Sequence, residues 1–411
     1  AAVVFDLRFP WDRLPVIALV FLLGAACFAA LGFAAAMVLR GSEAVLTFTM
    51  GSFLLVAFAS GTFAPDMALP RPLDVASWAL PVRHFATAFG DQFDPSVGAG
   101  VTWTQVAVLL AWLAAGAWLG LRRFSWEPAA GRVGGGSGRS MWAGLRRRPG
   151  FAAGAAPARR RPRFVTMAWA QLRQANRQVW RQPGSVFFAV LFPLMFVVVV
   201  PYAFGQPVID GVELARIVVP AMAVFGVVVT AFVNLPENVA AARDSGVLKR
   251  LRGTPLPAGA YVTGRLGSTL YVGSLAALGA FAAGWVVHGV VVPAGSVPAL
   301  LVVFVVGIPA LAALGLALVA LVPDAATVPA VALGAFLPLA FVSDILAFGM
   351  ELPAALQTVG WLFPFKHLVN AAEAALGTGQ VAGGHLVVVV GWGLAGALVA
   401  VLRFRWQPKP G

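Results

Sequence analysis

The chain has 411 residues, of which 60 % are hydrophobic and 11 % are charged. A soluble globular protein carries about 25 % charged residues, so this composition excludes an ordinary soluble domain and indicates a membrane protein. The formal net charge is +13, but many cations gather between residues 122 and 181, which is typical of a cytoplasmic loop and argues against nucleic-acid binding.

Apolar blocks follow one another along the chain, most of them near the length of about 20 residues that a membrane-spanning helix needs. Backbone groups in lipid must form their hydrogen bonds within the segment, and barrel strands would be about half as long, so these blocks should be helices. We therefore predict an all-α polytopic membrane protein. The predicted spans are 14–39, 44–63, 106–121, 186–204, 217–233, 261–287, 297–322, 328–348 and 386–402.

The placement of Lys and Arg predicts the orientation, because cytoplasmic loops carry an excess of these residues. The segment 122–163 and the loop 243–252 are rich in cations and are expected inside. Between them, residues 206–213 carry Asp210 and Glu213 and no cation, as expected of an outside loop. We predict a multi-pass protein of the bacterial plasma membrane whose central linker and C-terminus are cytoplasmic.

An internal repeat relates the two ends of the chain at a constant offset of 283 residues. Aliphatic matches mean little in such a chain, but Trp, His, Met and Pro also coincide, and these rarely coincide by chance. The coinciding pairs are Met67 with Met350, Pro70 with Pro353, Trp78 with Trp361, Pro81 with Pro364 and His84 with His367. The repeat is direct, because both copies end with cations on the same side.

The repeat predicts the domain organisation. Residues 1–128, the N-terminal segment, are the second half of one unit, with about three spans, and residues 164–411, the C-terminal segment, are a complete unit of six spans. Residues 129–163 are rich in Gly, Ala and Arg and form a flexible basic linker. Because Ala1 aligns with Gly284 inside a span, the favoured interpretation is truncation of a longer two-copy protein. A first copy that became degenerate in evolution is the alternative.

An amphipathic helix is predicted over residues 164–182, immediately before a span. Apolar and cationic residues fall on different faces, so the helix should lie in the membrane interface with its apolar face in the lipid. The residues that mark these faces are Trp169, Leu172, Arg173 and Arg177.

The loop after the second span of the C-terminal segment reads Arg243-Asp-Ser-Gly-Val-Leu-Lys-Arg-Leu-Arg-Gly-Thr-Pro-Leu-Pro257. This string resembles the loop between the second and third spans of the type-two ATP-binding-cassette permeases, a family of bacterial drug, polysaccharide and lipid exporters. The resemblance implies a coupling helix that docks into the ATPase subunit, although many members have Glu where Ala242 stands. The residues it assigns to this element are Glu237, Arg243, Asp244, Gly246, Leu248, Lys249, Arg250 and Arg252.

A second resemblance to this family covers residues 343–367 and their copy at 60–84. A span ends, a Leu-Pro follows, then a short stretch with Trp, then Pro-x-Lys/Arg-His. The resemblance implies a re-entrant helix pair on the outer side that could form the exit gate. The residues assigned to it are Asp344, Pro353, Trp361, Pro364 and His367, with Pro70, Trp78, Pro81 and His84 in the copy.

Catalytic and nucleotide-binding motifs are missing from the sequence. Its three lysines, Lys249, Lys366 and Lys409, are followed by Arg, His and Pro, so no Gly-rich phosphate loop ends in Lys-Ser/Thr. The four histidines show no close metal-ligand spacing. We therefore expect no enzyme activity and no metal or cofactor on this chain, with ATP and Mg bound by a partner ABC ATPase subunit.

The predicted function is that of an exporter permease. The spans contain almost no charge, which suits a hydrophobic or amphipathic substrate such as a drug or lipid; export of glycan or lipid-linked precursors stays open. Two permease units would pair within the chain or as a dimer. An ion-coupled secondary transporter with parallel repeats is the alternative, and a membrane-embedded enzyme or scaffold is a third class.

Overall fold

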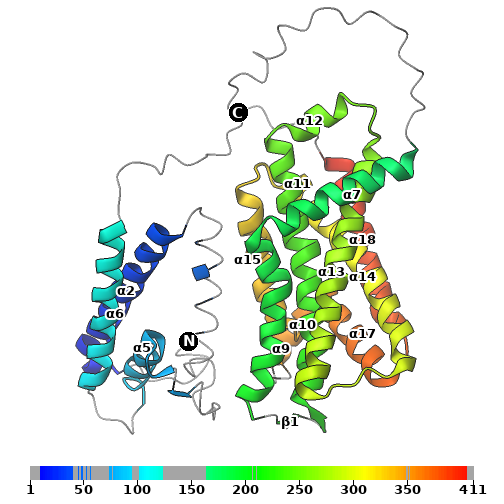
Figure 1. Ribbon diagram of the computed structural model, residues 1–411. Helices are drawn as coiled ribbons and strands as arrows, with labels where there is room; N and C mark the ends of the chain where they lie inside the picture. Colours follow the sequence, from blue (N-terminus) through cyan, green and yellow to red (C-terminus); the bar gives the residue numbers. More distant parts are fainter. Residues whose placement is uncertain are drawn as a thin grey trace, which may run out of the picture. The chain divides into compact units, whose positions relative to one another are not determined.

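A computed structural model describes residues 10–39, 77–94, 101–123, 163–205, 207–209, 211–348, 350 and 352–404, with isolated positions from 45 to 75. The chain forms two compact units, which are residues 1–40 with 88–163 and residues 41–87 with 164–411. Each unit is described by itself (Figure 1).

The smaller unit is built on two long helices that pack side by side, α2 (Leu14–Val38) and α6 (Trp103–Arg123). A short 3-10 turn, η1 (Trp11–Arg13), precedes α2. The helices approach closely because Gly116 leaves space where a Cβ atom would lie 2.9 Å from the carbonyl carbon of Ala30. Small residues at such contacts are typical of helix packing in membranes.

The first part of the C-terminal segment contains α7 and two spans, each interrupted by a π-helix. A two-stranded hairpin joins the spans, with Val208 opposite Glu213. The elements in order are α7 (Phe164–Trp180), α8 (Pro183–Val186), η2 (Phe187–Leu191), α9 (Phe192–Ala203), β1 (Val208–Ile209), β2 (Val212–Glu213), α10 (Leu214–Val228), η3 (Val229–Asn234) and α11 (Leu235–Asp244).

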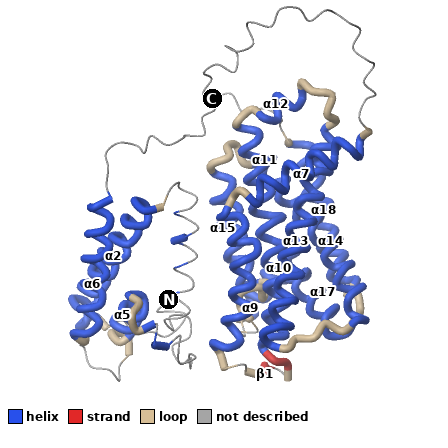
Figure 2. The backbone as a smooth tube through the Cα atoms, viewed as in Figure 1, coloured by secondary structure: helices blue, strands red, loops and turns tan. Residues whose placement is uncertain are grey.

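The remainder of the C-terminal segment is helical except for short connections, as Figure 2 shows. A short helix at one end of the unit is followed by two long helices, a shorter one, and a pair that precedes the last span. These elements are α12 (Val247–Arg252), α13 (Ala258–His288), η4 (Ala294–Ser296), α14 (Val297–Leu321), α15 (Thr327–Val342), α16 (Ala354–Leu362), α17 (Pro364–Thr378) and α18 (Gly383–Arg403). α5 (Pro81–Gly90) belongs to the sequence that precedes α6.

Both π-helices have the same local cause. A proline, Pro193 or Pro236, stands two residues after each π-helix ends. A proline ring clashes with the carbonyl four residues earlier, and the wider π turn relieves that clash. Neighbouring glycines accommodate the displaced backbone: Cβ atoms at Gly226 and Gly315 would lie 2.7 and 2.5 Å from carbonyl oxygens of η2 and η3.

Helix α10 forms the centre of the core, since nearly all of its residues are buried. It is contacted by α9, α13, α14 and α17. Phe192 stacks between Phe196 and Phe225, with ring centroids 4.5 and 4.7 Å apart. By contrast, α18 exposes large apolar residues such as Val387 and Val401, as expected of a helix that faces lipid.

Among the described residues, seven helices are long and apolar enough to cross a membrane. The predicted fold class, an all-α polytopic membrane protein, is therefore confirmed. Two predicted boundaries were wrong: the span 217–233 is part of a longer helix from Leu214 to Asp244, and the span 328–348 ends as a helix at Val342. The predicted span 44–63 lies largely outside the described residues.

Candidate functional site

The loop 243–257 is built around a short helix that is anchored by a single apolar side chain. α11 ends at Asp244, and Gly246, with φ +71°, makes the left-handed turn into α12, a conformation that favours glycine. Leu248 is completely buried and packs with Ala242 and Tyr261. A side chain longer than that of Ala242 would have to enter this contact.

The cations of α12 point away from this anchor. Lys249, Arg250 and Arg252 are all exposed, and within the described residues none of them forms an ion pair. Glu237 is half-buried in the first turn of α11. The loop therefore presents three cations on a short, anchored helix at one end of the unit, where α12 lies in Figure 1.

Arg243 has a different environment from these cations, because it is only 5 % exposed. Its Nη1 donates hydrogen bonds to the carbonyl oxygens of Val319 (3.0 Å) and Val322 (3.3 Å), and its Nη2 donates to that of Pro323 (2.9 Å). These carbonyls belong to the C-terminal end of α14, where backbone acceptors lack helical partners and the dipole favours a cation.

Asp244 completes the contact with the turn between α14 and α15. Its Oδ1 accepts a hydrogen bond from Arg243 Nε at 2.9 Å, and its Oδ2 accepts one from the amide of Ala325 at 2.6 Å. In the same turn, Asp324 accepts hydrogen bonds from the hydroxyl and amide of Thr327, which hold the pKa of the Asp324 carboxyl below its ordinary value. We call the Arg243–Asp244 pair with these contacts the inner clamp.

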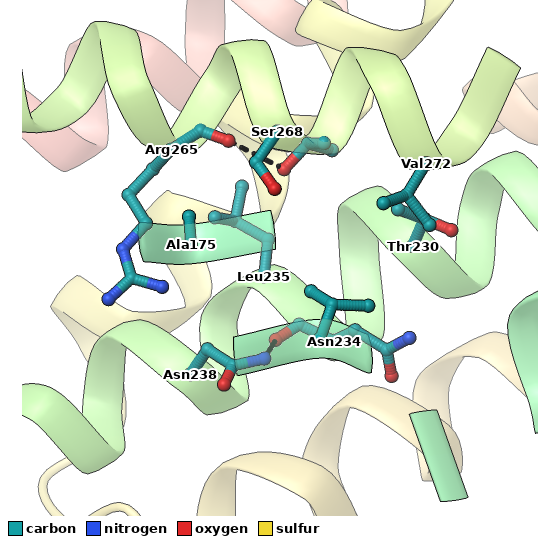
Figure 3. A pocket seen from close by; sticks show the side chains of 10 residues that line it. Ala175, Thr230, Asn234, Leu235, Asn238, Arg265, Ser268 and Val272 are labelled. Atoms are coloured by element: carbon teal, nitrogen blue, oxygen red, sulfur yellow. Dashed lines mark hydrogen bonds between the residues drawn. The ribbon is translucent and has the colours of Figure 1, made fainter. Parts of the chain in front are cut away.

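A chain of polar side chains links α7, α11 and α13, and Figure 3 shows its members Arg265, Asn234 and Asn238. Arg265 Nη1 donates to Gln178 Oε1 at 3.0 Å, and Gln178 Nε2 donates to Asn238 Oδ1 at 2.8 Å. Asn238 Nδ2 donates to the carbonyl of Asn234 at 2.8 Å, and Asn234 Nδ2 donates to that of Ser185 at 3.3 Å. The network therefore ties residues 234–238, where the helix of the second span continues beyond its predicted end, to α7 and α13.

Beside the network is a cavity of about 20 Å³. The hydroxyl of Ser268 lines it and has no hydrogen-bond partner, and Thr230 lies on its far side in Figure 3. A cavity of this size, with polar walls, has room for one water molecule. It is too small for a transported substrate.

Arg265 is a buried cation that the sequence interpretation did not single out. It is 8 % exposed, and within the described residues no carboxylate lies within ion-pair distance. It falls inside the predicted span 261–287, and an arginine inside an apolar block is itself a signal of function. The ring of Tyr261 lies 5.3 Å from its guanidinium carbon.

The predicted amphipathic helix is α7, and it packs on α13 through small residues. Ala168 and Ala175 are buried, and a Cβ atom at Gly264 would lie 2.8 Å from the carbonyl oxygen of Ala168. Leu172 faces the same helix, because it is the nearest neighbour of Gly267. Trp169 is 54 % exposed, with the exposed Arg173 5.7 Å from its ring and Arg177 exposed one turn further on. The prediction that the apolar and cationic residues lie on different faces was therefore wrong for Trp169, because residues four apart share one side of a helix.

The predicted outer segment forms the pair α16 and α17. Pro353 precedes α16 and Pro364 begins α17. His367 Nε2 lies 2.9 Å from the carbonyl oxygen of Trp361, and its Nδ1 lies 2.9 Å from Nδ1 of His385. The sequence interpretation missed His385, which comes from α18.

Asp344 and Lys366 form an ion pair that joins the end of α15 to α17. Lys366 Nζ lies 2.7 Å from Asp344 Oδ2, and the lysine side chain is 7 % exposed. Its ammonium also lies 5.4 Å from the ring of Trp361. Of these three residues, the sequence interpretation named Asp344 and Trp361 as site residues but not Lys366, which it named only among the three lysines of the chain.

The corresponding part of the N-terminal segment repeats several of these contacts. His84 Nε2 lies 2.8 Å from the carbonyl oxygen of Trp78, and the guanidinium of Arg83 lies 4.3 Å from the Trp78 ring. Pro81 begins α5 as Pro364 begins α17. Pro70 lies outside the described residues.

Helix boundaries follow the same spacing. α2 and α14 begin and end 283 positions apart, as do η1 and η4. α6 and α18 begin and end 280 positions apart. The contact of Gly116 with Ala30 recurs as that of Gly396 with Ala313, where a Cβ atom would lie 3.0 Å from the carbonyl carbon.

Comparison with known proteins places more than half of the chain in one family. The family model described as "ABC-2 type transporter" matches residues 164–376, which include the α11–α12 loop and most of α17. No curated protein matches the chain.

Proposed function

The chain belongs to the ABC-2 type transporter family, and on this premise we propose that it is the permease of an exporter driven by a separate ATPase subunit. The observation that carries the proposal is α12, a short helix with a buried apolar anchor and three exposed cations that no described residue neutralises. ATP and Mg belong to the partner subunit, and this chain acts as the transport subunit.

The docking surface consists of Lys249, Arg250 and Arg252. Exposed cations steer and orient an acidic partner surface, whereas Leu248 fixes the helix to the permease. Arg243 and Asp244 act differently from the role that the resemblance assigned to them, because the clamp occupies both side chains within the chain itself. They pass on movement of α12 instead of contacting the ATPase.

The loop 243–252 and the central linker lie on the cytoplasmic side in this proposal, with the hairpin β1–β2 outside. α7 lies in the inner interface, where Trp169 contacts lipid and Arg173 and Arg177 meet anionic headgroups. The spacing of cations supports this orientation.

The two segments derive from a duplicated unit, of which the N-terminal segment retains the second half. Two observations support this origin: helix boundaries recur 283 positions apart, and the His–Trp contact is found in both segments. Permease units pair around one pathway, either within the chain or between two chains, and α16–α17 with its counterpart around α5 form the outer gate.

The substrate is hydrophobic or amphipathic, a drug or a lipid. The aromatic cluster of Phe192, Phe196 and Phe225 supports this class. Arg265, a cation inside a span, lies near the predicted cytoplasmic end of α13. It is distant in sequence from these three phenylalanines.

The experiment is co-expression with an ABC ATPase subunit encoded in the same genome, followed by co-purification. The test variant changes Lys249, Arg250 and Arg252 to Glu. The matched control changes three exposed cations at other helix ends on the same predicted side, Arg122, Arg123 and Arg403, to Glu.

The wild type and the control variant are expected to retain the ATPase, and the test variant is expected to lose it. Retention by the test variant would refute the docking surface. An ATPase that associates with none of the proteins, together with export that collapses when the proton gradient is dissipated, would favour the secondary transporter instead.

A further inference from the structure

Helix α15 ends on a strained residue. Asp344 has φ +60°, in the left-handed region where residues other than glycine are uncommon. The amides of Ile345 and Leu346 both donate to the carbonyl of Ala340, which closes the helix end. Helices that end in this way usually place glycine at the left-handed position, and the N-terminal segment has Gly61 at the corresponding place in the sequence.

The strain has an electrostatic reason. A buried ammonium without a partner is strongly unfavourable, and Lys366 of α17 is almost fully buried. The Asp344 carboxylate, at 2.7 Å, neutralises it. An aspartate in a glycine position therefore joins α15 to the outer helix pair, and glycine there would remove this ion pair.

The N-terminal segment neutralises its equivalent cation differently. Arg83 pairs with Asp74 at 2.5 Å. Asp74 corresponds to Gln357 in the repeat, not to Asp344. The ion pair of the N-terminal segment thus lies within the stretch 74–83, whereas that of the C-terminal segment reaches back to the preceding long helix.

The opposite end of α15 is held by the inner clamp. Asp244 accepts from the amide of Ala325, two residues before α15 begins, and Arg243 binds the carbonyls at the end of α14. Both clamp residues stand at the end of α11, next to α12. Helix α15 is therefore connected by charged side chains to α11 at one end and to α17 at the other.

We propose that α15 is a lever that carries displacement of the α11–α12 loop to the α16–α17 pair, with the Asp344–Lys366 ion pair as its outer latch. The sequence has Gly61 at the latch position of the N-terminal segment, and Arg83 pairs with Asp74 there, so the two outer segments respond unequally to the ATPase. This proposal rests on the proposed function, because docking of the ATPase supplies the displacement.

The test is hydrogen–deuterium exchange of the full chain in complex with its ATPase, with and without ATP and vanadate. In the wild type, exchange is expected to change with nucleotide both in α11–α12 and in residues 354–378. Asp344→Asn removes the charge but keeps a residue that tolerates the left-handed conformation. In this variant the response of residues 354–378 is expected to disappear, while that of α11–α12 stays.

Two further variants separate the latch from a merely structural role. Lys366→Arg keeps the charge, as Arg83 does in the N-terminal segment, and is expected to retain the outer response. Asp74→Asn breaks only the N-terminal ion pair and is also expected to retain it.

The lever would be overturned if the ATPase docks normally on Asp344→Asn and the exchange of residues 354–378 changes with nucleotide as much as in the wild type. Loss of the response in Lys366→Arg would also overturn it. A wild-type chain that binds no ATPase would instead overturn the proposed function, and the lever with it.

Discussion

Two arginines seven positions apart, Arg243 and Arg250, provide a sharp test of the inner loop. Both lie in the string that resembles the coupling element, yet Arg243 is 5 % exposed and Arg250 is exposed. Changing each to Ala should therefore have opposite consequences. Arg243→Ala should destabilise the permease, whereas Arg250→Ala should weaken ATPase binding and leave stability unchanged.

The magnitude follows from the contacts of Arg243. The bonds to Val319 at 3.0 Å and Pro323 at 2.9 Å are charge-assisted and contribute about 1.5 kcal/mol each. The bond to Val322 is longer, at 3.3 Å, and the ion pair with the partly exposed Asp244 is screened by solvent. The expected loss is therefore on the order of 3 kcal/mol. For the exposed Arg250 the expected change is within about 0.5 kcal/mol.

The assay is equilibrium unfolding of the purified permease in mixed micelles of mild detergent and dodecyl sulfate, followed by tryptophan fluorescence. ATPase binding is measured on the same two variants. Equal stability of Arg243→Ala and Arg250→Ala would refute the reasoning, because it would mean that the carbonyl contacts contribute nothing. Normal ATPase binding by Arg250→Ala would separately contradict the docking surface.

Three further predictions concern packing and protonation. Gly264→Ala should force α7 away from α13 and lower stability by about 1–3 kcal/mol, measured by the same unfolding assay, whereas Gly259→Ala, whose new Cβ would meet nothing closer than 3.6 Å, should not. Gly396→Leu should disrupt the packing of α18 on α14, which a loss of folded protein in size-exclusion chromatography would reveal. Because the pKa of Asp324 is lowered in the fold, its stabilisation should be present above pH 3.8 and disappear as the pH falls below that value, and Asp324→Asn should abolish this acid sensitivity in melting curves between pH 3 and 6.

The spans could be predicted from the sequence because the need to cross the hydrocarbon imposes length and composition. Their ends were harder to predict. The polar residues Asn234 and Asn238 resemble the end of a span, yet the network with Gln178 buries them within a continuing helix. In the same way, residues 343–348 are mostly apolar, but α15 ends at Val342 because the chain turns at the left-handed Asp344.

The residues of the candidate site were predicted through resemblance and repetition, which identify positions and not surroundings. The sequence does not distinguish the buried Arg243 from the exposed Arg250, because only tertiary packing determines which cation is buried. Asp344 and Lys366 are 22 positions apart, so their pairing depends on the fold of the chain between them and has no local pattern. Arg265 did carry a signal, an isolated cation in an apolar block, and this signal was overlooked.

The central claim, that an ATPase docks on α12, is tested most directly by photo-crosslinking in cells. A photoreactive amino acid replaces Arg250 in one variant and Val212, an exposed residue of the hairpin, in another. The account predicts that the variant at position 250 is crosslinked to the ATPase and that the variant at position 212 is not. Capture from position 212 with none from position 250 would contradict both the docking surface and the orientation of the permease.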